Sequence, residues 1–300
     1  MARPGTVRVY ELGIAERRQV ADLLDDLLDS RLDPAEDTLY RLGWELPALL
    51  PGGVRRVLYE LRTAASAPAC LIRGMHIDDT ALGEPPADGP AAHGFTRTRL
   101  EEMYLAVVSM GLAEAVGRGD RVVGDLLPTA PAGDRPLAVA GGAGPDRCDY
   151  LGLLSLRGGP SGTTLALAAV PDVRLAGAHA AVLRQPRFHS AAGSGPVLAG
   201  APGAPLLCLD PFRATAGDGD HEAGRALGAL RDGLLGCRQE IVLEPGDLLF
   251  VDTFQALVSG PAVPGGWLKT ISLTRDPRRL NGPRSAATPA RTLRDIGTDH

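Results

Sequence analysis

The stretch LAVAGGAGPDRCDYLGLLSLRGGPSGTTL, residues 137–165, decides the fold class of this chain. Its second half contains a nearly all-apolar run, Tyr150–Leu156. A turn of Arg, Gly and Pro follows, and a second extended run restarts at Gly162. Short apolar runs bounded by Gly and Pro are typical of buried β-strands. The sequence therefore predicts two buried strands here, joined by a Gly-rich turn.

Other short segments predict further strands with helices between them. Apolar residues at positions 20, 23, 24, 27 and 28 follow the spacing of one helix face. The segment IVLEPGDLLFV, residues 241–251, predicts a hairpin because Pro presets φ and Gly accepts positive φ in its turn. Trp267–Thr274 predicts one more strand. Many short strands with helices outside them favour a double-sheet jelly roll, in the α+β class but mainly β.

The length predicts a single large domain. Three hundred residues can bury one core, and we expect one jelly-roll domain with N-terminal helices over residues 1–280. Residues 281–300 are polar and rich in Pro, Arg and Ser, so we expect a disordered tail.

Composition excludes several classes of function. The net charge of −5 comes from 36 acidic and 31 basic residues without a basic block, so nucleic acid is not an expected partner. No apolar run is long enough to cross a membrane, and the N-terminus lacks the apolar core of a signal peptide, which predicts a cytoplasmic protein. The four cysteines are far apart and form no CxxC pair, so neither a zinc site nor disulfides are expected.

Several segments together resemble a known family. These segments are Leu71–Gly74, Arg147–Leu153, Gln185–Phe188, Leu243–Asp247, Trp267–Lys269 and Thr274–Asp276, and they occur in the family's order. With them the chain resembles the clavaminate synthase-like branch of the iron(II)/2-oxoglutarate oxygenases, which contains hydroxylases of free amino acids. The resemblance spans roughly residues 35 to 279 and implies a double-stranded β-helix, the jelly roll predicted above.

The family's iron ligands are missing from this sequence. The resemblance places its His-x-Glu or His-x-Asp pair on Ala138 and Ala140. It places the second His on Val258 or Ser259, depending on one gap. Three side chains, two imidazoles and one carboxylate, hold the metal in such sites, and aliphatic side chains have no lone pair to offer. We therefore predict that the protein holds no metal.

The family's contacts to 2-oxoglutarate are missing as well. The positions where the resemblance implies arginines are Gly266 and Thr270, and a glutamine-bearing loop is deleted around residues 117–119. The sequence therefore predicts no cofactor, with both iron and 2-oxoglutarate absent. Ala138, Ala140 and Val258 would then line an enlarged, neutral pocket.

Other potential sites are weaker. His76-Ile77-Asp78 with His189 imitates an iron triad, but the family has no ligand at that early strand. Gly141–Gly144 lacks the context of a phosphate loop, so we interpret it as a small-residue pocket wall.

Four polar residues are candidates for the chemistry of such a pocket: Asp210, Arg275, Thr164 and Ser259. Asp210 matches an acid that contacts a basic substrate side chain in the amino-acid hydroxylases. A desolvated Asp could act as acid or base, and Arg275 could hold a substrate carboxylate. The alternative is that Asp210 caps its turn and that Arg275 pairs with Asp276 or Asp252.

Three functional hypotheses follow. The first is a metal-independent enzyme of specialised metabolism that performs a non-redox step, such as cyclisation, elimination, isomerisation or condensation, on an amino-acid-derived small molecule. The second is a non-catalytic pseudo-oxygenase that acts as a scaffold or partner protein, or as a homodimer. The third is an amino-acid hydroxylase that uses iron(II) and 2-oxoglutarate with atypical ligands.

Overall fold

The computed structural model describes most of the chain. The described residues are 5–30, 32, 39, 42, 45–65, 67–82, 98–117, 123–126, 137–139, 147–158, 162–191, 193–259, 266–275 and 291–292. Ala140, Gly141–Gly144 and Asp276 lie outside these ranges, as do residues 281–300 apart from 291–292.

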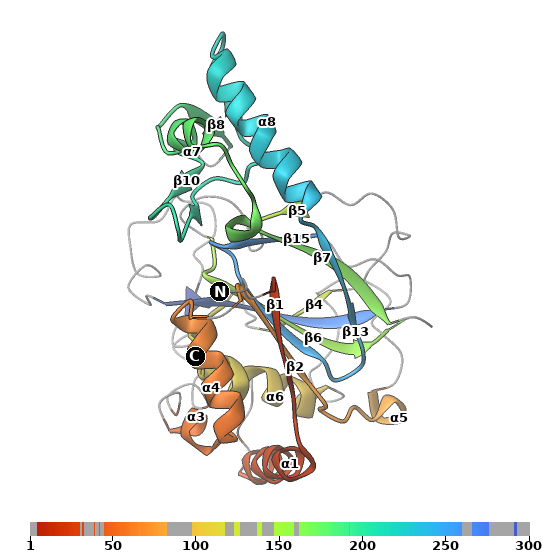
Figure 1. Ribbon diagram of the computed structural model, residues 1–300. Helices are drawn as coiled ribbons and strands as arrows, with labels where there is room; N and C mark the ends of the chain where they lie inside the picture. Colours follow the sequence, from red (N-terminus) through yellow and green to blue (C-terminus); the bar gives the residue numbers. More distant parts are fainter. Residues whose placement is uncertain are drawn as a thin grey trace.

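Two β-sheets face each other at the centre of the molecule (Figure 1). The predicted jelly roll is confirmed, with the chain mainly β in its core. The large sheet has the order β1 (Val7–Glu11), β2 (Ala69–Arg73), β14 (Leu248–Asp252), β6 (Tyr150–Arg157), β16 (Trp267–Thr274), β3 (Glu114–Gly117) and β17 (Arg291–Thr292), with β4 (Val123–Leu126) also paired to β16. The small sheet has the order β13 (Gln239–Leu243), β7 (Thr163–Ala169), β15 (Ala256–Ser259) and β5 (Leu137–Ala138).

An apolar layer fills the space between the two sheets, which we call the barrel interior. Leu71, Leu153 and Leu268 contribute to it from the large sheet, and Leu165 and Leu167 from the small one. Side chains alternate between the faces of a strand, so every second residue of these strands points into the interior.

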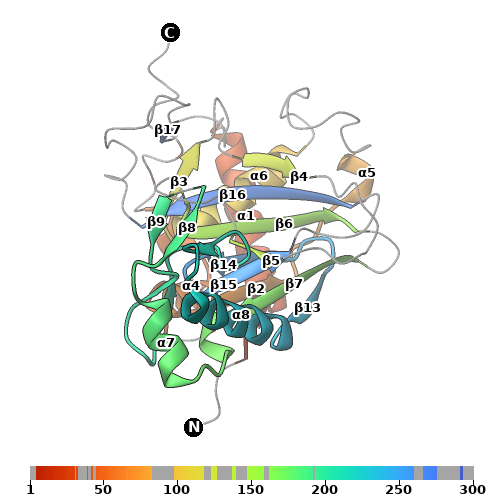
Figure 2. The same ribbon diagram turned by 90° about the horizontal axis from the view of Figure 1, so that it is seen from above.

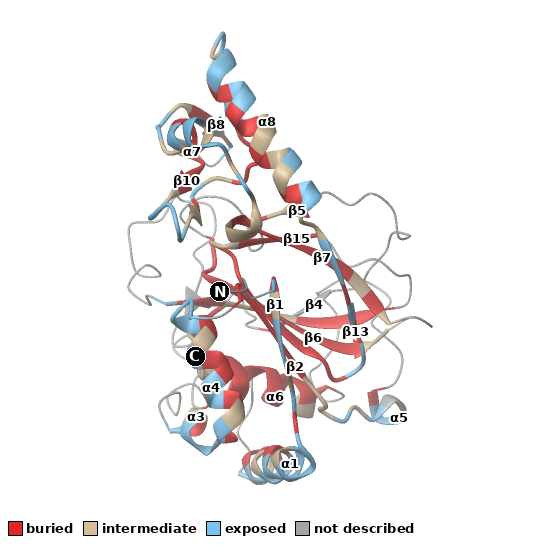
Figure 3. Ribbon diagram, viewed as in Figure 1, coloured by how far each residue is buried: buried red, intermediate tan, exposed pale blue. Residues whose placement is uncertain are grey.

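The helices cover the outer faces of both sheets. Outside the large sheet lie α1 (Ile14–Asp29), α3 (Leu46–Leu49), α4 (Gly52–Arg62) and α6 (Arg99–Met110), and a short α5 (Asp79–Leu82) follows β2. The buried positions of α1 are Val20, Leu24 and Leu27, as the spacing in the sequence predicts. Figure 3 shows α6 buried along most of its length, while α1 exposes its outer side.

The small sheet is covered by α7 (Gly177–Leu183) and α8 (His221–Gly236), as seen from above in Figure 2. Arg187 ties the segment after α7 to the start of α8, where it pairs with Asp220 and Glu222. Short strands complete this side of the molecule: β8 (Phe188–Ser190), β9 (Gly193–Gly195), β10 (Leu198–Ala199), β11 (Leu206–Leu207) and β12 (Thr215–Ala216). No helix in the described part of the chain is long and apolar enough to cross a membrane.

The predicted hairpin at residues 241–251 is wrong. β13 pairs with β7 in the small sheet, whereas β14 pairs with β2 and β6 in the large sheet. The Glu-Pro-Gly-Asp turn therefore carries the chain from one sheet to the other. Gly246 has φ 88° and packs so closely on the Met75 carbonyl that a Cβ would collide with it. The turn signal was correct, but a local signal does not fix which strand pairs with which.

Candidate active site

Ala138 and Val258, two positions where the family carries ligands, are direct partners in the structure. Val258 on β15 pairs with Ala138 on β5 and, on its other side, with Leu167 on β7. Directly paired residues present their side chains on the same face of a sheet. Leu167 belongs to the apolar layer between the sheets, so Ala138 and Val258 also face the barrel interior.

Ser259 faces the opposite side. It pairs with Leu137, which packs in the outer layer beneath α7 and α8. The backbone N–H of Ala166 donates a hydrogen bond of 2.8 Å to the Ser259 hydroxyl oxygen. Of the two registers that the sequence left open, the structure therefore turns Val258 and not Ser259 toward Ala138.

The positions expected to anchor 2-oxoglutarate carry no cation. Thr270 pairs with Leu153 and shares its inward direction, and Gly266 is buried just before β16. The nearby cation, Lys269, points the other way: its Nζ lies 2.7 Å from Glu102 Oε1 on α6, and both side chains are buried. Lys269 is therefore part of the packing between the sheet and α6.

Asp210 is buried beside the strand that carries Ala138. It is 4% exposed, and its carboxylate accepts hydrogen bonds from the backbone N–H groups of Phe212 at 2.9 Å and of Val139 at 3.1 Å. Arg213 Nε lies 3.8 Å away at the exposed side. Asp210 thus caps its own turn, as one alternative predicted, and also ties that turn to the residue after Ala138.

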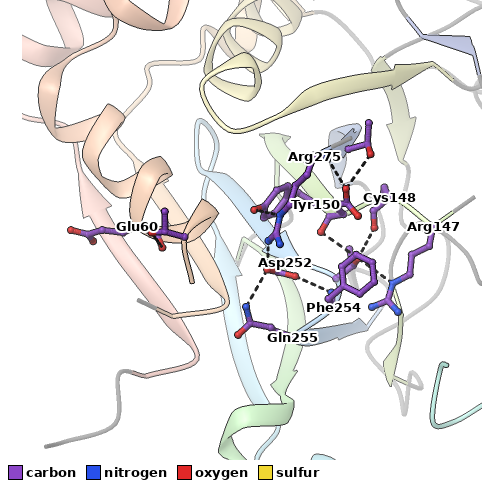
Figure 4. Close-up of polar contacts among 12 residues, drawn as sticks. Glu60, Arg147, Cys148, Tyr150, Asp252, Phe254, Gln255 and Arg275 are labelled. Atoms are coloured by element: carbon purple, nitrogen blue, oxygen red, sulfur yellow. Dashed lines mark hydrogen bonds and ion pairs between the residues drawn. The ribbon is translucent and has the colours of Figure 1, made fainter. Parts of the chain in front are cut away.

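Arg275 lies in a network of polar contacts, which we call the Arg275 cluster (Figure 4). Its Nη2 is 2.6 Å from Asp252 Oδ2, and its Nε donates to the Tyr150 hydroxyl at 2.6 Å. Its backbone N–H and the Thr274 hydroxyl both donate to Asp149 Oδ2. The structure thus shows the pairing of Arg275 with Asp252, which was the structural alternative for this residue.

The pKa values in this cluster reflect burial and pairing. Burial raises the pKa of Asp252 above its usual range, and the Arg275 guanidinium offsets this only in part. Burial also raises the pKa of Tyr150 to about 12. Arg275 therefore neutralises the carboxylate of Asp252, whose side chain is completely buried.

Thr164 is not brought together with the other candidates. It is half-buried on β7 opposite Val242, and its neighbour Leu165 faces the barrel interior. By alternation, Thr164 faces outward. Of the four polar candidates, Asp210 and Ser259 contact residues next to Ala138, namely Val139 and Leu137, and a catalytic role for any of them stays a prediction.

Arg147 begins one of the segments that resemble the family, but the sequence analysis gave it no role in the site. It is 6% exposed, its Nε donates to the Thr253 hydroxyl at 3.2 Å, and its Nη1 donates to the Leu207 carbonyl at 2.9 Å. Its guanidinium stacks 4.3 Å from the centre of the Phe254 ring. Burial lowers the pKa of Arg147 to about 10, so it remains charged at neutral pH. An arginine three residues before the buried strand β6 was the available signal.

The sequence pattern of His76, Asp78 and His189 does not form an iron triad in the structure. His189 is exposed and hydrogen-bonded through Nδ1 to Ser194 at 2.7 Å, on the strands outside the small sheet. Within the described ranges, no three His, Cys, Asp or Glu side chains lie close enough together to hold a metal. The structure therefore gives no support to His76 and Asp78 as ligands.

Comparison with known proteins finds a similar hydroxylase and a similar oxygenase. No family model matches the chain. It is similar to enduracididine beta-hydroxylase of Streptomyces hygroscopicus, with 25% identity over 331 aligned positions that cover 89% of this chain and 94% of the relative. It is also similar to the non-heme iron oxygenase OrfP in complex with Fe, with a TM-score of 0.82 and 28% identity over 94% of this chain and 99% of OrfP. The predicted resemblance to the clavaminate synthase-like oxygenases is confirmed by these two relatives.

These relatives correct part of what the sequence predicted. Structures of OrfP contain Fe with L-Arg and Fe with alpha-ketoglutaric acid, and their TM-scores to this chain are 0.82 and 0.83. The expectation of no cofactor is therefore wrong by this comparison, and so is the description of a metal-independent pseudo-oxygenase that performs a non-redox step. The relatives favour the hydroxylase hypothesis.

The residues at the matched positions nevertheless do not fit an iron centre of the family's pattern. Ala138 and Val258 present only methyl groups to the barrel interior, and Thr270 offers a hydroxyl where a cation was expected. Iron(II) needs imidazole or carboxylate ligands, and a carboxylate of 2-oxoglutarate needs a positive partner. Ala140 lies outside the described residues.

Proposed function

We propose that this chain is an iron(II)/2-oxoglutarate-dependent hydroxylase of a free amino acid with a basic side chain, with a ligand set that departs from the family's pattern. The observation that carries the proposal is the whole-length likeness to two proteins of this kind. One is named for its hydroxylation of enduracididine, and the other has been solved with L-Arg, with L-canavanine and with hydroxylated arginines. L-Arginine is therefore the first substrate to test.

Asp210 supports the choice of a basic substrate. A carboxylate has about four lone-pair sites, and the Val139 and Phe212 N–H groups occupy one on each oxygen. Each oxygen thus keeps an acceptor site for a guanidinium, which prefers to bind a carboxylate through two parallel hydrogen bonds. The two backbone contacts hold the carboxylate in place, so that little side-chain freedom is lost when a substrate binds.

The substrate would lie at the same end of the barrel as Ala138. Val139, which donates to Asp210, directly follows Ala138 in the chain, and Ala138 faces the barrel interior with Val258. A substrate held by Asp210 would therefore extend toward two aliphatic side chains. These groups exclude water and leave room for the substrate's methylene carbons.

The test is an anaerobic reconstitution followed by an assay. The protein is loaded with Fe(II), given 2-oxoglutarate and L-arginine, and exposed to oxygen, and succinate and hydroxylated arginine are measured by mass spectrometry. The proposal expects both products in equal amounts. Asp210→Asn, which keeps the shape and removes the charge, should raise the KM for arginine by about tenfold. A matched control is Asp232→Asn on α8, which should leave the KM unchanged. Absence of both products with every basic amino acid tried would refute the proposal.

A further inference from the structure

Arg147 is a buried cation whose neighbouring buried carboxylates, Asp252 and Asp210, act on it only from beyond ion-pair distance. The described residues include no carboxylate within 4.0 Å of its guanidinium, in contrast to Arg275 with Asp252. Its partners are a hydroxyl, a backbone carbonyl and an aromatic ring. Its Nη2 is inaccessible to solvent and has no hydrogen-bond partner in the described structure.

An unsatisfied buried guanidinium nitrogen is costly and calls for a physical reason. Buried donors are almost always hydrogen-bonded, and a charged group loses more than a neutral one when it leaves water without a partner. The described residues around Arg147 provide no acceptor for its Nη2. In the same region, by contrast, Arg275 is hydrogen-bonded to Tyr150 and to the buried carboxylate of Asp252. Binding of an exchangeable anionic ligand by Arg147 would explain why its Nη2 has no acceptor while Arg275 is paired.

The position of Arg147 places it beside the proposed substrate site. Its Nη1 binds Leu207 on β11, three residues before Asp210. Arg147 itself lies on the connection between β5 and β6, which begins at Val139, the residue that donates to Asp210. The β5–β6 connection is therefore joined to the segment of residues 207–210 twice, once through Arg147 and once through Asp210. Figure 4 shows Arg147 approaching Phe254 from the side opposite to Asp252.

We propose that Arg147 Nη2 binds the carboxylate of a small ligand at this end of the barrel, so that Arg147 and Asp210 together recognise opposite charges. This inference rests on the proposed function, since it names the residue that holds the ligand's acid group. The carboxylate could belong to the amino acid or to a 2-oxo acid. In the second case, Arg147 would do the work that Thr270 cannot do.

The chemistry of Arg147 suits this role. A guanidinium keeps its charge at neutral pH and binds a carboxylate with charge-assisted hydrogen bonds, which strengthen where water is excluded. Thr253 and Leu207 hold its Nε and Nη1, so the free Nη2 has a fixed direction before any ligand binds. A preorganised donor of this kind loses little entropy on binding.

Titration calorimetry of the unmodified protein identifies the carboxylate without any substitution. L-Arginine, agmatine and 2-oxoglutarate are titrated separately in the presence of Fe(II). Agmatine keeps the guanidinium of arginine and lacks its carboxylate. If Arg147 binds the amino acid's carboxylate, arginine should bind at least about tenfold more tightly than agmatine. If it binds the 2-oxo acid, 2-oxoglutarate should bind and the arginine-to-agmatine ratio should be near one.

Two variants assign the effect to Arg147. Arg147→Gln should lower the affinity for the carboxylate ligand that binds by about tenfold or more and leave the affinity for agmatine unchanged. Arg147→Lys should lose less affinity because one charged donor remains. The matched control is Arg231→Gln. Arg231 on α8 also holds the β11–β12 connection, through the carbonyls of Pro211 and Ala214, both at 2.7 Å. Melting curves identify any variant that fails to fold, and the ligand comparison on the unmodified protein then decides.

The outcomes separate this inference from the proposed function. Equal affinity of the unmodified protein and Arg147→Gln for both carboxylate ligands would overturn the inference while hydroxylation could still be observed. Equal losses of carboxylate affinity in Arg147→Gln and Arg231→Gln would also overturn the inference, because the effect would then come from loosening the β11–β12 connection. Carboxylate binding that depends on Arg147 but gives no succinate would retain the inference and refute the hydroxylase. No binding of arginine or 2-oxoglutarate to the unmodified protein would overturn both.

Discussion

Arg275 and Arg147 lie on either side of the turn between β14 and β15, and they differ in what surrounds them. Arg275 contacts Asp252 and Tyr150, so its charge is compensated within the protein. Arg147 stacks on Phe254 and has an Nη2 without a partner in the described part of the structure. Their pKa values follow the same division: Asp252 and Tyr150 help to raise that of Arg275 despite its burial, whereas burial lowers that of Arg147 to about 10.

The difference teaches how a buried arginine can be interpreted. A guanidinium whose hydrogen bonds end on a buried carboxylate contributes to the native structure, and removing either partner leaves the other charge exposed to a low dielectric. A guanidinium without a counter-charge costs stability in the free protein and gains its partner from outside. The sequence left open whether Arg275 holds a substrate carboxylate or pairs with Asp276 or Asp252, and the structure shows the pairing with Asp252.

The largest expected effect comes from breaking the Arg275 cluster at Asp252. Asp252→Ala should lower the free energy of unfolding by about 3 kcal/mol, because Arg275 and the N–H of Phe254 lose their acceptor. Urea denaturation measures this. Glu60→Gln is the control, since Glu60 lies 4.0 Å from an exposed Arg56 and such a pair contributes about 0.5 kcal/mol or less. A loss below about 1 kcal/mol for Asp252→Ala would mean that the cluster is not structural.

The pH dependence sharpens the same test. Because the pKa of Asp252 is raised in the folded protein, its pH-linked contribution to stability is complete below the usual carboxyl pKa and is lost as the pH rises through the raised value. Asp252→Asn lacks this titration. Its stability deficit relative to the unmodified protein should therefore be larger at pH 4 than at pH 7. A deficit that grows toward pH 7 would contradict the raised pKa.

A second experiment tests the register on the Arg147 side of the barrel. Ala138→His with Val258→His should create a two-imidazole metal site, because cross-strand partners have Cβ atoms about 4.5–5.5 Å apart. With Ni(II) at one hundred times its dissociation constant, the free energy of unfolding should rise by about 2.7 kcal/mol. Ala138→His with Ser259→His is the control, since Ser259 faces the other side of the sheet. Stabilisation of the control alone would show that the register is wrong.

The smallest expected effect compares the two arginines directly. Arg275→Gln leaves Asp252 buried without its cation, whereas Arg147→Gln removes a cation that contacts no carboxylate among the described residues. The unfolding free energy of Arg275→Gln should therefore be lower than that of Arg147→Gln by about 1–2 kcal/mol in the absence of ligand. Urea denaturation of both variants under identical conditions measures the difference. Equal losses would mean that Arg147 is as structural as Arg275, and its proposed role in binding would then need another explanation.

The sequence by itself determined the fold family and the missing ligand atoms. The order of short apolar segments and the family segments near Arg147, Pro245 and Trp267 sufficed to predict the jelly roll, because alternation and turn residues are local properties of the chain. The absence of imidazole and carboxylate at residues 138 and 258 is likewise independent of any coordinates. What those absences mean for the cofactor was predicted wrongly, and only the relatives corrected it.

Tertiary structure alone decided the directions and partners of the side chains. Val258 and Ser259 are adjacent in sequence, and only the pairing of β15 with β5 and β7 shows which one faces the interior. A shift of one residue reverses every side chain on a strand, so no local pattern fixes this choice. For the same reason, the sequence could not show that Arg275 contacts Asp252 or that Arg147 contacts Thr253 and Leu207, because these partners lie far away in the chain and are brought near by packing of the whole barrel.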